Sequence, residues 1–254
     1  MKRIVLLLLV VPLFSISQTK ESTWSLSLEP MLYRNMETLI LAKKNKALGM
    51  LFKGEWNKAT ISGIHRAGLT FIYARPKNEF EPANVTLAMN VDLKYSYLIK
   101  LKSVEKAGLY LGGMAQADYK LAYYVLWDDS HMYWADFWGI GFSSWLEKPL
   151  KERSGFIASF ELPVFGLASR PPLRRDYKID DQSFGGIMEM AHQDLKVVSP
   201  VSYFNPVLKF GIRLKYSDKF STDFYYHFEY LNADISYSDE YKQLQHGLGI
   251  NLIF

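Results

Sequence analysis

The feature that most constrains the fold is a long alternation of apolar and polar side chains at residues 85–101. Every odd-numbered residue from Val85 to Leu101 is apolar, whereas the even-numbered positions are mostly small or polar. A period of two places the two sets on opposite faces of one β-strand. Because strands of globular proteins usually have about 5–6 residues, this length favours a strand that crosses a membrane.

The same alternation recurs along the chain and predicts an all-β fold of about ten antiparallel strands. We expect them at residues 23–33, 47–56, 61–75, 84–101, 107–124, 133–146, 154–166, 203–216, 220–236 and 244–254. In an up-and-down transmembrane barrel the strand number is even, the periplasmic turns are short and the outer loops are longer. The turns would be 57–60, 102–106, 147–153 and 217–219, and the loops 34–46, 76–83, 125–132, 167–202 and 237–243.

Two segments leave the strand number open. The alternation is weakest at residues 47–56, and the segment 186–198 could form a helical turn or an extra hairpin. Losing the first or gaining strands in the second would give about eight or twelve strands, which are also even numbers. Residues 35–46 could form a short helix over the mouth of the barrel.

Alternation alone is compatible with two environments. In a secreted, lipocalin-like carrier the apolar faces point inward, whereas in a membrane barrel they point outward and the polar faces fill the lumen. The strand lengths favour the membrane barrel, and so do aromatic residues near strand ends, which form interfacial girdles. Examples are Trp24, Tyr33, Tyr73, Tyr123 and Trp134.

The last predicted strand carries a more specific pattern. From residue 248 onward its even positions are apolar and end in an aromatic residue: Leu248, Ile250, Leu252 and Phe254. This strand resembles the C-terminal strand of bacterial outer-membrane β-barrels, which ends in an aromatic residue and is read by the barrel-assembly machinery. The resemblance is to the broad class, and it implies a Gram-negative outer-membrane location with membrane lipid and that machinery as partners.

The N-terminus has the layout of a secretory signal peptide. Lys2 and Arg3 precede an apolar stretch from Ile4 to Phe14, and Ser15 and Ser17 supply small residues before a cut. A transmembrane helix needs about 20 apolar residues, more than this stretch contains. The sequence therefore predicts a signal peptide at 1–17 and a single barrel domain at 18–254.

Charge and composition exclude several other classes. The formal net charge of +4 is small and dispersed, so no nucleic-acid surface is expected. The chain has no cysteine, and it has no metal-ligand spacing or phosphate loop of a known type, so we expect no metal and no cofactor. Arg174 and Arg175 could contact lipopolysaccharide phosphates at the outer rim. The sequence does not determine the oligomeric state.

A barrel of about ten strands is too narrow to be an empty pipe. The polar faces of two neighbouring strands carry opposite charges, which we interpret as a lumenal ion-pair network. Its predicted members are Lys209, Arg213, Lys215, Asp223, His227 and Glu229. Such a filled lumen favours a structural, adhesive or narrow-substrate transport role.

The alternative is a lipid- or peptide-hydrolysing barrel. A carboxylate that orients a histidine can activate water, and the outer loops supply both groups at Asp128, Asp129, His131, His192 and Asp194. Paired aspartates with histidine resemble the omptin proteases, which also have ten strands. The spacing departs from the omptin pattern, so their catalytic roles are not carried over.

Overall fold

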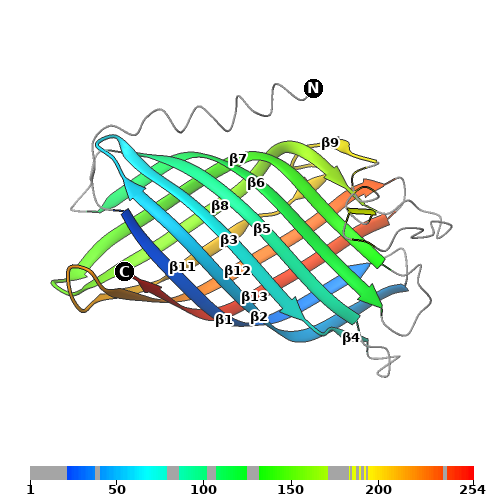
Figure 1. Cartoon of the computed structure of the whole chain (residues 1–254), viewed down its shortest axis with the longest axis horizontal. Helices are drawn as coiled ribbons and strands as arrows, with labels where there is room; N and C mark the ends of the chain where they lie inside the picture. Colours follow the sequence, from blue (N-terminus) through cyan, green and yellow to red (C-terminus); the bar gives the residue numbers. More distant parts are fainter. Residues whose placement is uncertain are drawn as a thin grey trace.

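The computed structural model describes residues 22–37, 41–78, 86–101, 107–124, 132–170, 183, 185–186, 189, 192, 194–236 and 239–254. Ten long strands form one closed antiparallel barrel, and three short strands are added to it (Figure 1). The long strands are β1 (Ser22–Glu37), β2 (Leu41–Ala59), β3 (Gly63–Ala74), β5 (Thr86–Lys100), β6 (Gly108–Tyr124), β7 (Met132–Lys151), β8 (Ser154–Ser169), β11 (Val207–Lys215), β12 (Ser221–Ser236) and β13 (Asp239–Ile253).

The short strands are β4 (Lys77–Asn78), β9 (Lys196–Val198) and β10 (Tyr203–Phe204). Each long strand pairs with its sequence neighbour, and β1 closes the barrel by pairing with both β2 and β13. The predicted all-β, up-and-down barrel is therefore confirmed. Within the described ranges, no helix is long and apolar enough to cross a bilayer.

The apolar faces of the strands point outward. Leu93 on β5 is 59% exposed, whereas its neighbours Asp92 and Lys94 line the lumen. Leu248, Ile250 and Leu252 on β13 are likewise exposed. This arrangement is the opposite of a lipocalin-like carrier, whose apolar faces would be buried inside, so that alternative is wrong.

Several strands run further than their sequence pattern indicates. Residues 35–46 form no helix in their described part, because β1 continues to Glu37 and β2 starts at Leu41. Backbone pairing between the two strands satisfies the peptide groups there and overrides the local helical pattern. Similarly, β7 extends to Lys151, which reduces the expected turn 147–153 to Glu152 and Arg153.

The two ends of the barrel differ. One end, here called the terminal end, holds Ser22, Phe254 and the connection between β11 and β12. The opposite end, here called the loop end, carries the long connection between β8 and β11. The longest strand, β7, has 20 residues; tilted by about 40°, such a strand rises about 50 Å, more than the roughly 30 Å of a hydrocarbon layer.

The backbone pairing of the wall is interrupted between β8 and β11. β11 pairs with β8 only as far as Glu161, and β9 resumes pairing with β8 at Gly166. Between them β10 pairs with β12 instead, so residues 162–165 of β8 have no ladder partner on that side. Pro163 and Pro206 lie at this gap, and neither has a backbone N–H to donate to a ladder.

Candidate functional site

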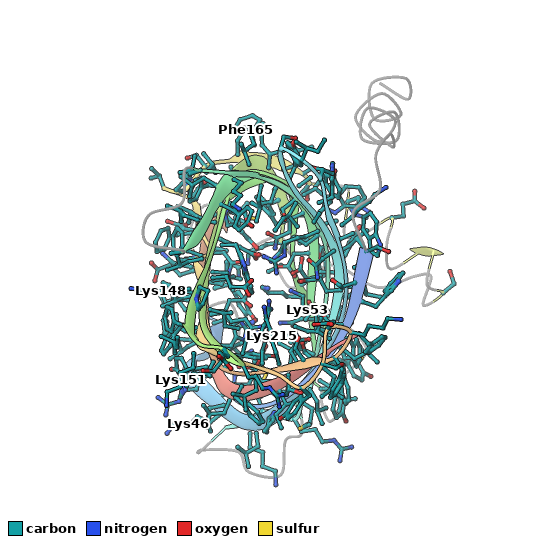
Figure 2. The ribbon with its side chains drawn as sticks, turned by 90° about the vertical axis from the view of Figure 1, so that its left-hand side faces the viewer. Lys46, Lys53, Lys148, Lys151, Phe165 and Lys215 are labelled. Carbon is teal, nitrogen blue, oxygen red and sulfur yellow. The ribbon has the colours of Figure 1, made fainter. Side chains whose placement is uncertain are left out.

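The lumen is the candidate functional site because polar and charged side chains converge there from every part of the barrel. Figure 2 views the terminal end and shows Lys53 and Lys215 inside the ring of strands, with Lys148 and Lys151 outside it. Inward and outward positions alternate along each strand. The polar residues of the alternating sequence pattern therefore point inward and fill the lumen.

The layer nearest the terminal end is centred on Arg213. Its guanidinium donates Nε–H and Nη2–H to the carboxylate of Asp223 at 2.7 and 3.0 Å, and Nη1–H to Glu147 at 3.1 Å. Asn251 donates to the same Asp223 carboxylate at 3.2 Å and accepts from Ser27 at 2.8 Å. Strands β1, β7, β11, β12 and β13 are therefore tied together at this level.

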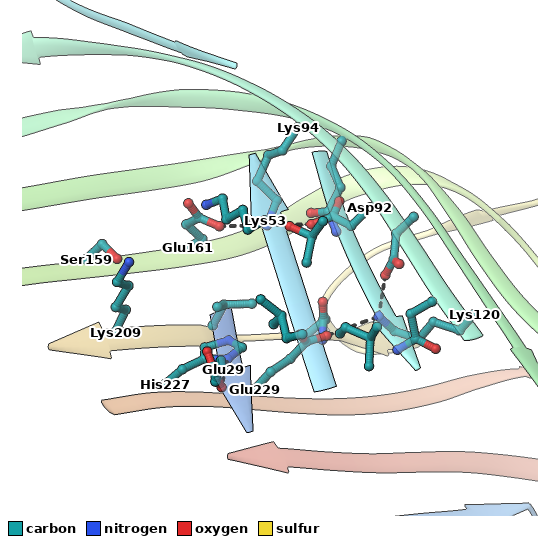
Figure 3. Close-up of a pocket in the computed structure, with 18 of the residues that line it drawn as sticks. Glu29, Lys53, Asp92, Lys94, Lys120, Ser159, Glu161, Lys209, His227 and Glu229 are labelled. Atoms are coloured by element: carbon teal, nitrogen blue, oxygen red, sulfur yellow. Dashed lines mark hydrogen bonds and ion pairs between the residues drawn. The ribbon is translucent and has the colours of Figure 1, made fainter. Parts of the chain in front are cut away.

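The central layer contains two further clusters. Glu55 accepts Nη2–H of Arg66 at 2.9 Å and contacts Lys53 at 2.7 Å. Lys94 donates to Glu161 across the lumen at 2.7 Å and lies 3.1 Å from Asp92 (Figure 3). Such pairs offset the free-energy cost of holding charges away from bulk water.

A third layer lies nearer the loop end and is centred on Lys120, whose side chain is only 4% exposed. Its ammonium contacts Asp118 at 2.6 Å and Glu229 at 3.1 Å. Asn205 also donates to Glu229 at 3.0 Å. Residues more than one hundred positions apart in sequence thus meet across the lumen.

Between this layer and the loop end, apolar and aromatic side chains form a buried cluster. This group, here called the outer plug, consists of Ala135, Phe137, Ala168, Val198, Tyr203, Leu231, Ala233, Ile235 and Tyr241, all buried. The rings of Phe137 and Tyr203 stack with their centroids 4.5 Å apart. Tyr203 belongs to β10, so this short strand contributes one residue to the outer plug.

The described part of the lumen contains a small central cavity and a wider vestibule. A central cavity of about 70 Å³, lined by residues of the central and third layers, has room for only a few water molecules. A much larger vestibule of about 880 Å³ lies at the terminal end and is lined by Thr23, Arg153 and Phe254 among others. Arg66 and Lys209 line both spaces and so mark the boundary between them.

The residues predicted for the lumenal network all lie inside the barrel, but they do not form one cluster. Of the six, only Arg213 and Asp223 face each other directly and bind. His227 lies 3.0 Å from Glu29, Glu229 binds Lys120, and Lys215 is 4.0 Å from Glu147 and more than half exposed. Lys209 lies opposite His227 and over the ring of Tyr225.

Sequence reasoning missed most partners of these residues. The missed charges are Glu29, Lys53, Glu55, Arg66, Asp92, Lys94, Asp118, Lys120, Glu147 and Glu161. Most occupy the polar phase of a predicted strand, so the period of two could have placed them in the lumen. Which of them pair across the lumen depends on barrel closure, and no local pattern encodes it.

The described residues do not bring the candidate catalytic residues of the outer loops together in one site. Asp128, Asp129 and His131 lie outside the described residues, as do Arg174 and Arg175. His192 lies against β6 and β7, with Nε2 3.3 Å from Oη of Tyr119 and its ring edge-on to Trp138. Tyr119 and Trp138 belong to the outward phases of their strands, so His192 lies on the outer wall.

Asp194 is exposed on the same connection. No group of three or more His, Cys, Asp or Glu side chains in the described ranges is arranged to hold a metal ion.

The apolar residues of the last strand form part of the outer wall. Ile250 and Leu252 pair with Leu28 and Leu26 of β1, and all four are exposed on the outward face. Phe254 follows β13 and exchanges two backbone hydrogen bonds with Trp24, of 2.8 and 2.9 Å. The C-terminal residue thus takes part in closing the barrel.

Comparison with solved structures gives the class of the fold. The matching structures are bacterial outer-membrane β-barrel proteins, and this chain has the same type of closed barrel. It is similar to the outer-membrane protease OmpT of Escherichia coli, with a TM-score of 0.57, 8% identity and coverage of 93% of this chain and 97% of that one.

Weaker similarities lead to other members of the class. An outer-membrane channel of Pseudomonas putida F1 matches with a TM-score of 0.42 and 8% identity over 94% of this chain and 97% of that chain. No protein-family model matches the sequence, and no curated protein matches it. The similarity to OmpT extends to the fold alone.

Proposed function

We propose that this protein is a sealed barrel of the bacterial outer membrane with a structural role, and that it is not a diffusion channel. The observation that carries the proposal is the filling of the lumen. The outer plug and three layers of ion pairs occupy it, and the central cavity measures only about 70 Å³. An open porin, by contrast, uses about 16–18 strands to leave an aqueous channel.

Conductance measurements test the sealed lumen directly. The purified protein reconstituted in planar bilayers should give no discrete current steps. A variant that replaces Lys94, Lys120, Glu161 and Glu229 by alanine, together with Phe137→Ala and Tyr203→Ala, should conduct if it retains the barrel fold. Regular single-channel steps from the wild-type protein would contradict the proposal and favour narrow-substrate transport.

The location and assembly of the protein belong to the same proposal. Exposed apolar faces support insertion in lipid, and the fold is that of outer-membrane barrels. We infer export through cleavage of residues 1–17, and recognition of Leu248, Ile250, Leu252 and Phe254 by the assembly machinery. The terminal end is then periplasmic. N-terminal sequencing of the mature protein, and the folded yield of Phe254→Ala in cells, test these steps.

The hydrolase alternative stays a prediction. The only support within the described residues is that His192 contacts Tyr119 on the outer wall, where lipid headgroups lie in such barrels. Turnover of fluorogenic phospholipid and peptide substrates by the wild type, lost in both Asp129→Ala and His192→Ala, would establish it. Unchanged turnover in these variants, or none in the wild type, would exclude these residues as catalysts.

A further inference from the structure

The floor of the vestibule carries cationic groups that the ion-pair layers do not fully satisfy. Arg66 of β3 and Lys209 of β11 line both the vestibule and the central cavity. They therefore lie where the wide space narrows to the small one. Figure 3 shows Lys209 projecting from β11 with its nitrogen toward Ser159 of β8.

Lys209 forms no ion pair or hydrogen bond with a carboxylate among the described residues, although Glu55 and Asp223 lie close enough to attract its charge. Its cross-strand neighbours are Ser159 and His227, neither of which is a carboxylate. Its ammonium lies 3.6 Å from the centroid of the Tyr225 ring. A cation–π contact of this kind attracts the charge but does not neutralise it.

Arg66 is held in place and still has donor capacity. Its Nη2 donates to both oxygens of Glu55 at 2.9 and 3.1 Å, and its Nε donates to Asn57 at 3.2 Å. The guanidinium also lies 4.7 Å from the ring centroid of Trp145. Nη1, however, is buried and has no hydrogen-bond acceptor. A buried donor without an acceptor is unfavourable.

The neighbouring carboxylates are already engaged. Glu55 binds Arg66 and Lys53, while Asp223 and Glu147 bind Arg213. Glu161 binds Lys94. Nη1 of Arg66 and the ammonium of Lys209 are therefore left without a carboxylate acceptor, which an additional oxyanion would supply.

We propose that the vestibule floor binds a small oxyanion, a carboxylate or a phosphate, that enters from the terminal end and contacts Lys209 and Arg66. The vestibule of about 880 Å³ admits such a solute, whereas the cavity of about 70 Å³ beyond it does not let it pass. The barrel is on this view a receptor for an anion, which goes beyond the sealed structural role.

Thermal unfolding and calorimetry of the full chain in detergent micelles test the site. Inorganic phosphate and succinate serve as probes at constant ionic strength, with chloride as the baseline. We expect at least one probe to bind the wild type and raise its melting temperature. Lys209→Met should weaken that binding at least tenfold, and Lys209→Arg should retain it.

Lys148→Met is the matched control, because Lys148 is exposed on the outside of the ring at the same end (Figure 2). It should respond to the probes as the wild type does. Since Lys209 has no carboxylate to strand, Lys209→Met should fold, which its gel mobility before and after heating reports. The proposal fails if neither probe acts beyond chloride, or if folded Lys209→Met binds as tightly as the wild type. Conductance tests the sealed lumen, whereas calorimetry tests the anion site. Either proposal can therefore fail without the other.

Discussion

At the scale of single residues, the ion pairs of the lumen differ in what their loss should cost. Asp223→Ala removes the partner that Arg213 binds through two hydrogen bonds, while the guanidinium stays confined. Breaking a buried pair from one side typically costs about 3 kcal/mol. We expect a loss of this order in the free energy of unfolding, measured by urea titration in lipid vesicles. Adding Arg213→Met should recover part of it.

Lys120 and Lys215 provide a matched comparison. Lys120 is buried between Asp118 and Glu229, whereas the Lys215 side chain is 58% exposed and 4.0 Å from its carboxylate. Lys120→Met should lower stability by about 3 kcal/mol because it leaves two buried carboxylates unpaired. Lys215→Met should change it by less than about 0.5 kcal/mol. Equal melting of both variants would contradict the network as a stabilising feature.

At the scale of the strand, Gly249 on β13 leaves room for the ring of Tyr225 on the neighbouring β12. A Cβ at Gly249 would come within 2.3 Å of the Tyr225 ring. Gly249→Ala should therefore cost about 1–3 kcal/mol through overpacking. Gly113→Ala is the control, since a Cβ there would approach no atom closer than 3.7 Å. The same urea titration checks both, and a neutral Gly249→Ala would show that the ring has room to move.

The strands also show how far the sequence predicts the structure. Alternation identified the ten long strands, because each has an outward apolar face and an inward polar face. It missed their ends at the loop end, where pairing between β1 and β2 extends past the expected strand limits. It left β9 open as part of a possible hairpin within 186–198, and it did not separate β10 from β11 in the expected strand 203–216. It also missed the partner of Lys120 on β12, which lies far away in sequence.

At the scale of the whole molecule, closure of the barrel leaves the sheet without an edge strand. Every long strand has two neighbours, although residues 162–165 of β8 lack ladder partners on one side. We expect unheated protein in dodecyl sulfate to migrate differently from boiled protein on a gel. Identical migration before and after boiling would argue that the closed barrel does not persist outside lipid.

The interruption between β8 and β10 also bears on how the closed wall fluctuates. The seam between β1 and β13 lacks pairing at Glu29 and Pro30 within the range Ser25–Glu37, whereas four consecutive residues of β8, 162–165, lack ladder partners on one side. In hydrogen–deuterium exchange, the amides within residues 162–165 that face this gap should lose protection before those of the paired positions in the β1–β13 seam. Breathing of the cylinder would then begin in the middle of the chain, beside two prolines, and not at the junction where its first and last strands meet.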